Sequence, residues 1–448
     1  MDVPVQQFTT KAEQDLLDLY QQSADALPGN AAIAALRKSG IETYAGRGLP
    51  HRRVEEWKYT DLRGALDSVP PLLADREIAA GEADLEAAIG KVFMGLPAYR
   101  LVISAGEFRA DLSDVEGLRK AGVEVAALSQ MLESPPDWLT GSLEEAAGRD
   151  DMVIALNTAL MTAGIALRLP EGLTLQKPIH LIHLDTPGNA GSIYTRNAVV
   201  AEEGASATLI ETFGTFGVAG MQRNAVTTVS LAANSAIHHL KLQREALETI
   251  HLNVWAANVS AEARYNAFQV SMGAALARNQ VYVRFDGENA ATDISGATLA
   301  RGTQHCDTTL VVEHNVPSCE SRELFKLVLN DEARGVFQGK IVVAPDAQKT
   351  DGKQMSQALL LSETAEFDSK PELEIFADDV VCGHGATSGQ IDEELLFYLR
   401  ARGLPKAQAR AVLIQAFVGE AFEALDDEDI ADAFTAVAAE WLDDIELS

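Results

Sequence analysis

The chain is short of cysteines and of basic residues, and both shortages narrow its functional class. Its 448 residues include only Cys306, Cys319 and Cys382, too few for a disulfide framework. This favours a reducing compartment, and we expect a cytoplasmic protein. With 36 basic residues against 66 acidic ones, the formal net charge is −30. Such a charge repels nucleic acid and anionic membrane surfaces, so neither is expected as a partner.

Hydrophobic runs long enough to cross a membrane are also lacking. Met1 to Pro4 show no basic segment followed by an apolar core, so no secretory signal is expected. The most apolar window, from Met152 to Leu169, is interrupted by polar residues and by Gly164. It predicts a short helix, a glycine break and a strand rather than a membrane span.

Common catalytic motifs are missing as well. The nearest approach to a P-loop is GVFQGKI at 335–341, which has one spacer residue too few. It also has Ile341 where Ser or Thr must meet Mg²⁺, so any nucleotide hydrolysis is expected from a partner. No G-x-S-x-G, H-E-x-x-H or C-x-x-C motif occurs in the sequence.

Short alternating strands fill the chain from about residue 165 to residue 380. Gly204, Asn234, Glu262 and Asn289 mark turn-like clusters at intervals of 30, 28 and 27 residues. This period predicts a β-solenoid, with a propeller or a sandwich as rivals, and no Trp-Asp blade signature occurs. The clearest predicted strands are Val226–Leu231, Ile237–Gln243, Gln280–Phe285, Thr308–Val312 and Gly339–Val343.

Helical patterns lie on both sides of this stretch. Two helices separated by Pro28 and Gly29 are predicted before residue 48, and further helices are predicted from Asp392 to about Trp441. We therefore expect an N-terminal mixed α/β region at 1–150, a β-solenoid core at 151–389 and a C-terminal helical region at 390–448. Trp57 lies in a charged run and is expected to anchor that run against the core, with a binding role as the alternative.

Cys382 and His384 are the strongest candidates for chemistry. They are two residues apart, so on an extended strand both point to the same side. Gly383 and Gly385 flank the imidazole and let another surface approach closely. A thiolate and an imidazole suit zinc, copper or iron–sulfur chemistry, but two ligands leave a four-coordinate site incomplete. The remaining ligands would come from elsewhere in the fold or from a partner chain, and a packing role for Cys382 stays open.

Other histidines and cysteines are weaker candidates. His238 shares a strand face with Leu240 and Leu242, so it is expected to be a core histidine rather than a ligand. His305 and Cys306 are adjacent and point in opposite directions on a strand, so joint ligation is not expected.

A series of short motifs runs in order through the C-terminal half, and EEWKYTDL at 55–62 extends it toward the N-terminus. Together these motifs resemble the SufB/SufD family, the scaffold proteins of the SUF iron–sulfur cluster assembly system, and the N-terminal motif is similar to the SufD branch. The motifs are SRELFK at 321–326, ARGVFQGK at 333–340, QKTDG at 348–352, LLLS at 359–362, KPELEI at 370–375, DDVVCGHGAT at 378–387 and FYLRARG at 397–403.

The resemblance implies a mainly β fold: a right-handed parallel β-helix with helical regions at both ends. It also implies a heterodimer with SufB, joined through the β-helix edges near the C-terminal end, with a homodimer as an alternative for the isolated chain. Each subunit of such a complex carries one copy of the ATPase SufC on its C-terminal helical region, here 390–448.

The implied function is that of a non-catalytic scaffold. Iron or a nascent iron–sulfur cluster would be held transiently at the partner interface, with His384 facing it, Cys382 beside it and SufB supplying other ligands. Complexes of this kind are also linked to a reduced flavin, for which no motif is present, and the isolated chain is expected to hold no cofactor. The alternatives are a SufB-like homodimeric scaffold and a β-helix carbohydrate-active enzyme, which would need acidic and basic catalytic residues along one solenoid face.

Overall fold

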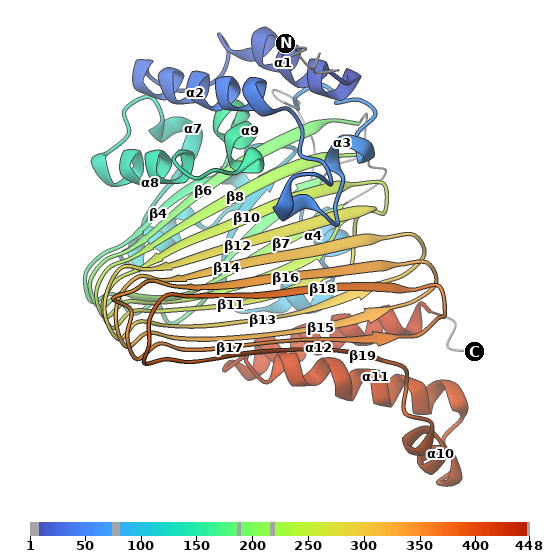
Figure 1. Ribbon diagram of the computed structural model, residues 1–448. Helices are drawn as coiled ribbons and strands as arrows, with labels where there is room; N and C mark the ends of the chain where they lie inside the picture. The colour runs from blue at the N-terminus through green and yellow to red at the C-terminus, as the bar shows by residue number, and fades with distance from the viewer. Residues whose placement is uncertain (1–8, 74–80, 186–189, 216–219, 446–448) are drawn as a thin grey trace, which may run out of the picture.

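Two stacked β-sheets form most of the molecule (Figure 1). The computed structural model describes residues 9–73, 81–185, 190–215 and 220–445. Within them, sheet A has nine strands in the order β18-β16-β14-β12-β10-β8-β6-β4-β3, and sheet B has ten in the order β19-β17-β15-β13-β11-β9-β7-β5-β1-β2. The strands are β1 Tyr99–Ser104, β2 Glu107–Phe108, β3 Glu124–Ala127, β4 Ile165–Leu169, β5 Ile179–Asp185, β6 Ser192–Ala201, β7 Ser206–Thr215, β8 Gln222–Leu231, β9 Ala236–Arg244, β10 Ile250–Val259, β11 Arg264–Ser271, β12 Leu276–Phe285, β13 Ala291–Ala300, β14 His305–His314, β15 Glu320–Leu329, β16 Arg334–Val343, β17 Asp351–Leu360, β18 Glu366–Ile375 and β19 Val381–Gly389.

From β4 onward, successive strands alternate between the two sheets, and each pairs in parallel with the strand two places along the chain. Two strands thus make one turn of a parallel β-solenoid, which confirms the predicted fold class. We call the space between the sheets the lumen. Its apolar half is a stack of side chains in register, such as Val229, Ala257, Val283 and Val312, all fully buried. Each such valine contributes roughly 1.5–3 kcal/mol of burial free energy.

The four residues that marked the sequence period lie at equivalent corners of successive turns. Gly204, Asn234, Glu262 and Asn289 have φ angles of 67°, 59°, 58° and 59°. The backbone N–H of Gly204 donates to the carbonyl of Ala233 at 3.0 Å, next to the marker of the following turn. These left-handed residues reverse the chain at the same place in each turn, so the spacing in the sequence is the length of one turn.

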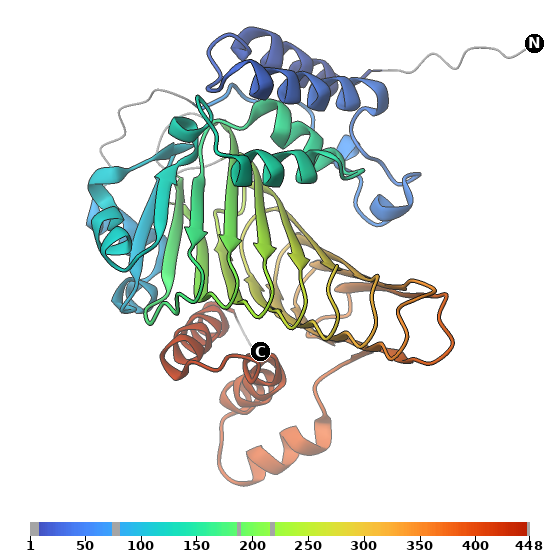
Figure 2. The same ribbon diagram turned by 90° about the vertical axis from the view of Figure 1, so that its left-hand side faces the viewer.

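Helices cover the outer faces of both sheets (Figures 1 and 2). α1, α2 and α9 pack on the N-terminal part of sheet A, and α4, α5, α11 and α12 pack on sheet B. Among the described helices, none combines the length and the apolar character that a membrane crossing requires. The helices are α1 Lys11–Ser23, α2 Ala31–Arg47, α3 Leu62–Ala65, α4 Glu82–Ile89, α5 Lys91–Gly95, α6 Val115–Lys120, α7 Leu128–Met131, α8 Asp137–Ala147, α9 Met152–Leu160, α10 Glu393–Ala401, α11 Lys406–Phe422 and α12 Glu428–Asp443.

Trp57 attaches the N-terminal charged run to the outer face of sheet A. Its ring is 3% exposed and lies 3.8 Å from the guanidinium of Arg278 on β12. Arg278 also donates to the carbonyl of Glu56 at 2.7 Å and pairs with the carboxylate of Asp307 on β14. The anchoring role expected for Trp57 is therefore confirmed, since a cation–π contact and charged hydrogen bonds fix the run in place.

Candidate functional site

The C-terminal end of the solenoid is open. β18 is the last strand of sheet A and pairs with β16, and β19 is the last strand of sheet B and pairs with β17. Within the described residues no strand lies on the other side of either, so both present a row of unpaired backbone groups. Figure 1 shows the two strands at the end of the stack opposite the N-terminal helices. This end is a ready surface for pairing with strands of another chain.

Large apolar side chains are exposed beside these edges. Phe376, directly after β18, is 63% exposed, and Val381, the first residue of β19, is 61% exposed. Ile375 at the end of β18 is exposed as well. Apolar side chains grouped on an open sheet edge are typical of surfaces that contact other proteins.

Cys382 and His384 both lie on β19, on the side that faces the lumen. Cys382 is half-buried and packs against the cluster that contains Ile341 and Val343 of β16. His384 is exposed and stands in register with Gln354, whose amide donates to the carbonyl of Gly339 across the lumen. Alternate residues of a strand share a face, and Cys382 and His384 do point to the same side of β19, as expected. The imidazole of His384 lies nearer to solvent than the thiol of Cys382.

Burial raises the pKa of the Cys382 thiol. A thiol in this state is a poor nucleophile until a metal or a cationic partner favours the thiolate. The other two thiols are still less available: burial raises the pKa of Cys306 to about 12 and that of Cys319 to about 11. Cys306 faces the lumen and its neighbour His305 faces outward to the Thr60 hydroxyl, so the opposite orientation expected for the two side chains is confirmed.

The two glycines beside His384 open the outer face of β19. A Cβ at Gly383 would meet nothing within 4 Å, and a Cβ at Gly385 would collide with the side chain of Met355 at 2.6 Å. Gly383 therefore leaves the backbone open to the close approach of another surface. Gly385 instead makes room for the side chain of Met355 on the neighbouring strand.

Below His384, a column of polar side chains continues into the lumen. Gln354 on β17 and Glu323 on β15 occupy the same register position as His384 on β19. Both carboxylate oxygens of Glu323 and the Oε1 atom of Gln354 are buried without a hydrogen-bond partner. Burial raises the pKa of Glu323 to about 8. The sequence interpretation missed this column, because its members are about 30 residues apart and converge only through the solenoid register.

No group of three or more His, Cys, Asp or Glu side chains in the described ranges is arranged to hold a metal ion. Cys382 and His384 therefore do not form a closed metal site with other side chains of the described chain. A structural zinc or iron–sulfur site needs four ligands, so this pair would need donors from a partner or from the metal's other bound groups.

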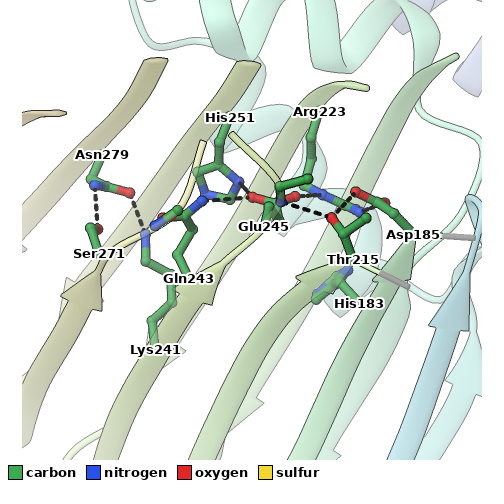
Figure 3. A network of polar contacts seen from close by, with 12 residues as sticks. His183, Asp185, Thr215, Arg223, Lys241, Gln243, Glu245, His251, Ser271 and Asn279 are labelled. Atoms are coloured by element: carbon green, nitrogen blue, oxygen red, sulfur yellow. Dashed lines mark hydrogen bonds and ion pairs between the residues drawn. The ribbon is translucent and has the colours of Figure 1, made fainter. Parts of the chain in front are cut away.

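A second group of polar side chains lies deeper in the lumen, toward the N-terminal end (Figure 3). Arg223 donates to Glu245 at 2.7 Å and also pairs with Asp185, and Nδ1 of His251 lies 2.7 Å from Glu245. Lys241 donates to the side chain of Asn279. All these side chains are almost fully buried. We call them the lumen network.

The lumen network is largely self-neutralising. Burial raises the pKa of Asp185 to about 7 and lowers that of Lys241 to about 7. Burial opposes ionisation of Glu245 too, but the charges of His251 and Arg223 outweigh it and hold the pKa of Glu245 far below its usual range. Buried charges persist only when paired in this way. Because the network is sealed from solvent, its carboxylates cannot reach a large substrate.

The position of His238 differs from the sequence prediction. His238 is half-buried on the outer face of sheet B with Leu240 and Leu242, and the core histidine of this strand is its neighbour His239. The prediction was wrong because both faces of sheet B are covered, so the apolar side of β9 faces the helices and its polar side faces the lumen.

Two models of known protein families match this chain, one in its N-terminal part and one in the remainder. Residues 184–417 match a family model described as "SUF system FeS cluster assembly, SufBD core domain". Residues 10–181 match the model "SufBD protein N-terminal region". The two matches together span the N-terminal helices, the solenoid, α10 and most of α11, and they end before α12.

Several curated proteins are similar over most of their length. The iron–sulfur cluster assembly protein SufD of Escherichia coli is 35% identical over 388 residues, covering 86% of this chain and 87% of that protein. A SufBD family protein of Synechocystis is 30% identical over 422 residues, covering 92% and 91%. The chloroplastic protein ABCI7 of Arabidopsis thaliana is 27% identical over 437 residues, covering 93% and 88%.

Proposed function

The chain belongs to the SufBD family of the SUF iron–sulfur cluster assembly system, and from this premise we propose that it is a non-catalytic scaffold subunit that pairs with SufB. The open C-terminal end of the solenoid is the observation that carries the proposal. β18 and β19 offer ten and nine residues of unpaired parallel edge, beside the exposed Phe376 and Val381. Strand addition from the solenoid of SufB would cover both.

His384 is the proposed contribution of this chain to the shared site. It is exposed on the last strand, where a partner strand would lie next to it. Iron or a nascent cluster would be cargo at this interface, with the other ligands coming from SufB and with Cys382 as a further donor. No resident cofactor is proposed for the isolated chain. A reduced flavin could take part in the complex, but we propose no residue of this chain as its binding site.

SufC is the second proposed partner, and α10 is its proposed docking element. α10 contacts α11, and Leu395, Phe397 and Tyr398 on it are all exposed. Exposed apolar and aromatic side chains on one short helix fit a groove on another protein. SufC would supply the nucleotide hydrolysis that this chain has no motif for.

The remaining parts of the proposal concern compartment and rival functions. The cytoplasm is the proposed location, in keeping with three cysteines that are free thiols. The carbohydrate-enzyme alternative loses support because the carboxylates of the lumen network are buried. A homodimeric scaffold would use the same open edges, so the composition of the complex decides between it and a heterodimer.

The His384→Ala variant tests the shared site. It should leave folding and binding to SufB unchanged, because the imidazole is exposed, and should lower cluster assembly in cells at least tenfold by removing a ligand. The measurement is the activity of an iron–sulfur enzyme in cells that depend on the SUF system.

Ser388→Ala is the matched control, since Ser388 is exposed on the same strand and on the same side as His384. Its cluster assembly should equal that of the unaltered chain. Normal assembly by His384→Ala would remove this histidine from the mechanism.

A further inference from the structure

Two oxygen donors lie in the lumen beneath His384 without partners. Glu323 is 3% exposed, and neither of its carboxylate oxygens has a partner in good hydrogen-bonding geometry, although the Ser321 hydroxyl on the same face of β15 lowers its pKa slightly. The Oε1 atom of Gln354, on the neighbouring strand at the same register position, is also buried and unpartnered. Buried polar atoms are nearly always paired, so two adjacent exceptions point to a ligand or water between them.

The neighbouring basic side chain, Arg322, lowers the pKa of Glu323 only through space and is paired with another carboxylate. Arg322 donates to the carboxylate of Asp351 at 2.8 Å and to two backbone carbonyls, and it lies on the opposite face of β15. An ionised carboxylate in an apolar lumen is costly unless a cation or a proton accompanies it. Because burial raises the pKa of Glu323 to about 8, its carboxyl holds a proton near neutral pH, and a small cation that enters the lumen would displace that proton.

Access to these atoms is through the open end. Glu323, Gln354 and His384 follow one another on adjacent strands, so the backbone of Glu323 is about 10 Å from that of His384. His384, the outermost of the three, is exposed. On the far side of the lumen, Gly339 leaves the space that the Gln354 amide fills, since a Cβ there would lie 2.3 Å from Gln354.

We propose that Glu323 and Gln354 form an inner site for one divalent cation, with water completing its coordination. The inference rests on the proposed function, in which the cation would be ferrous iron on its way to the shared site at His384. A carboxylate and an amide oxygen suit a hard or borderline divalent ion such as Fe²⁺, Mn²⁺ or Co²⁺. Two protein donors bind such an ion weakly, which fits a site that must release it, and they agree with the absence of a three-residue metal group in the described chain.

Anaerobic calorimetric titration of the full chain with Co²⁺ tests the inner site. The unaltered chain should bind one Co²⁺, and Glu323→Gln, which keeps the side-chain shape but not the charge, should weaken that binding at least tenfold. Gln354→Leu should weaken it to a smaller extent. Glu320→Gln is the matched control, because Glu320 is an exposed carboxylate on the same strand as Glu323 but on its outer face, and the affinity of this variant should be unchanged.

Two results would overturn the inner site: no Co²⁺ binding by the unaltered chain, or unaltered affinity in a correctly folded Glu323→Gln variant, as judged by near-UV circular dichroism. These results are separable from the proposed function. If Glu323→Gln binds Co²⁺ normally while His384→Ala still blocks cluster assembly, the inner site is wrong and the scaffold proposal stands. If Co²⁺ binding needs Glu323 while His384→Ala assembles clusters normally, the scaffold proposal loses its site and the cation site remains.

Discussion

Several histidines are buried in the neutral form, and this sets how the fold responds to acid. Burial lowers the pKa of His180 and His183 to about 3 and that of His314 to about 4. In the unfolded chain these groups titrate near their ordinary pKa of about 6.5. Between pH 6.5 and pH 4 the unfolded chain therefore binds more protons than the folded one, and stability falls as the pH falls.

His180 allows a direct measurement of this effect. Its Nε2 atom lies 2.8 Å from the Thr212 hydroxyl, and glutamine can keep such a contact. Lowering the pH from 7.5 to 5 should cost the unaltered chain about 2 kcal/mol of unfolding free energy through this residue alone. His180→Gln should lose about 2 kcal/mol less over the same range in urea unfolding. An equal loss in both proteins would show that His180 is not buried in the neutral form.

The sequence predicted some residues of the site and not others. Cys382 and His384 could be found because they share one strand and one short motif. Glu323 and Gln354 could not, because solenoid register alone brings them beneath His384. These side chains lie together only because the two intervening turns have the right number of residues. A change of one residue in either turn would move a side chain to the other face of its sheet.

At the level of elements, the strands and the repeat length could be predicted from the sequence. The positions of the last turns of the solenoid could be predicted only in part. Ser318 and Lys349 continue the series of left-handed corner residues with φ angles of 61° and 63°, but neither type is typical of that conformation. Pro371 was an available sign of an edge: it lies within β18, and proline is confined to edge strands. The window from Met152 to Leu169 gave a helix, a glycine break and a strand, as its pattern predicted.

α10 can be tested separately from the rest of the C-terminal region. Phe397 is 74% exposed, so Phe397→Asp should leave the melting temperature unchanged. If α10 docks SufC, the same change should weaken SufC binding at least tenfold by placing a charge in an apolar contact. Binding measured by surface plasmon resonance, with Glu393→Gln on the same helix as control, decides the matter. Unchanged affinity in Phe397→Asp would exclude this face of α10.

Deletion of all three C-terminal helices would be a poor substitute for this test. α11 and α12 cover Phe268 and Val328 on the outer face of sheet B with Phe422, Phe434 and other apolar side chains. Removing them would expose that face, and each covered side chain would lose roughly 1.5–3 kcal/mol of burial free energy. A truncated chain would therefore fail for reasons unrelated to SufC.

Across the whole molecule, the two ends of the solenoid are built differently. At the N-terminal end, sheet B finishes with the two-residue strand β2 and sheet A with the four-residue strand β3, both antiparallel to their neighbours. Short, reversed strands discourage further pairing. At the C-terminal end, long parallel strands stop without a cover in the described chain. The N-terminal end is thus closed to further strand pairing, whereas the C-terminal end has the open edges that the proposed pairing with SufB requires.

Native mass spectrometry of the purified chain mixed with SufB and SufC tests this account most directly. The unaltered chain should appear in a complex that holds one copy of it beside SufB. A variant with Phe376→Lys and Val381→Lys should keep its fold, because both side chains are exposed, and should lose SufB while keeping SufC. Retention of SufB by the double variant, or a complex that holds two copies of this chain and no SufB, would contradict the account.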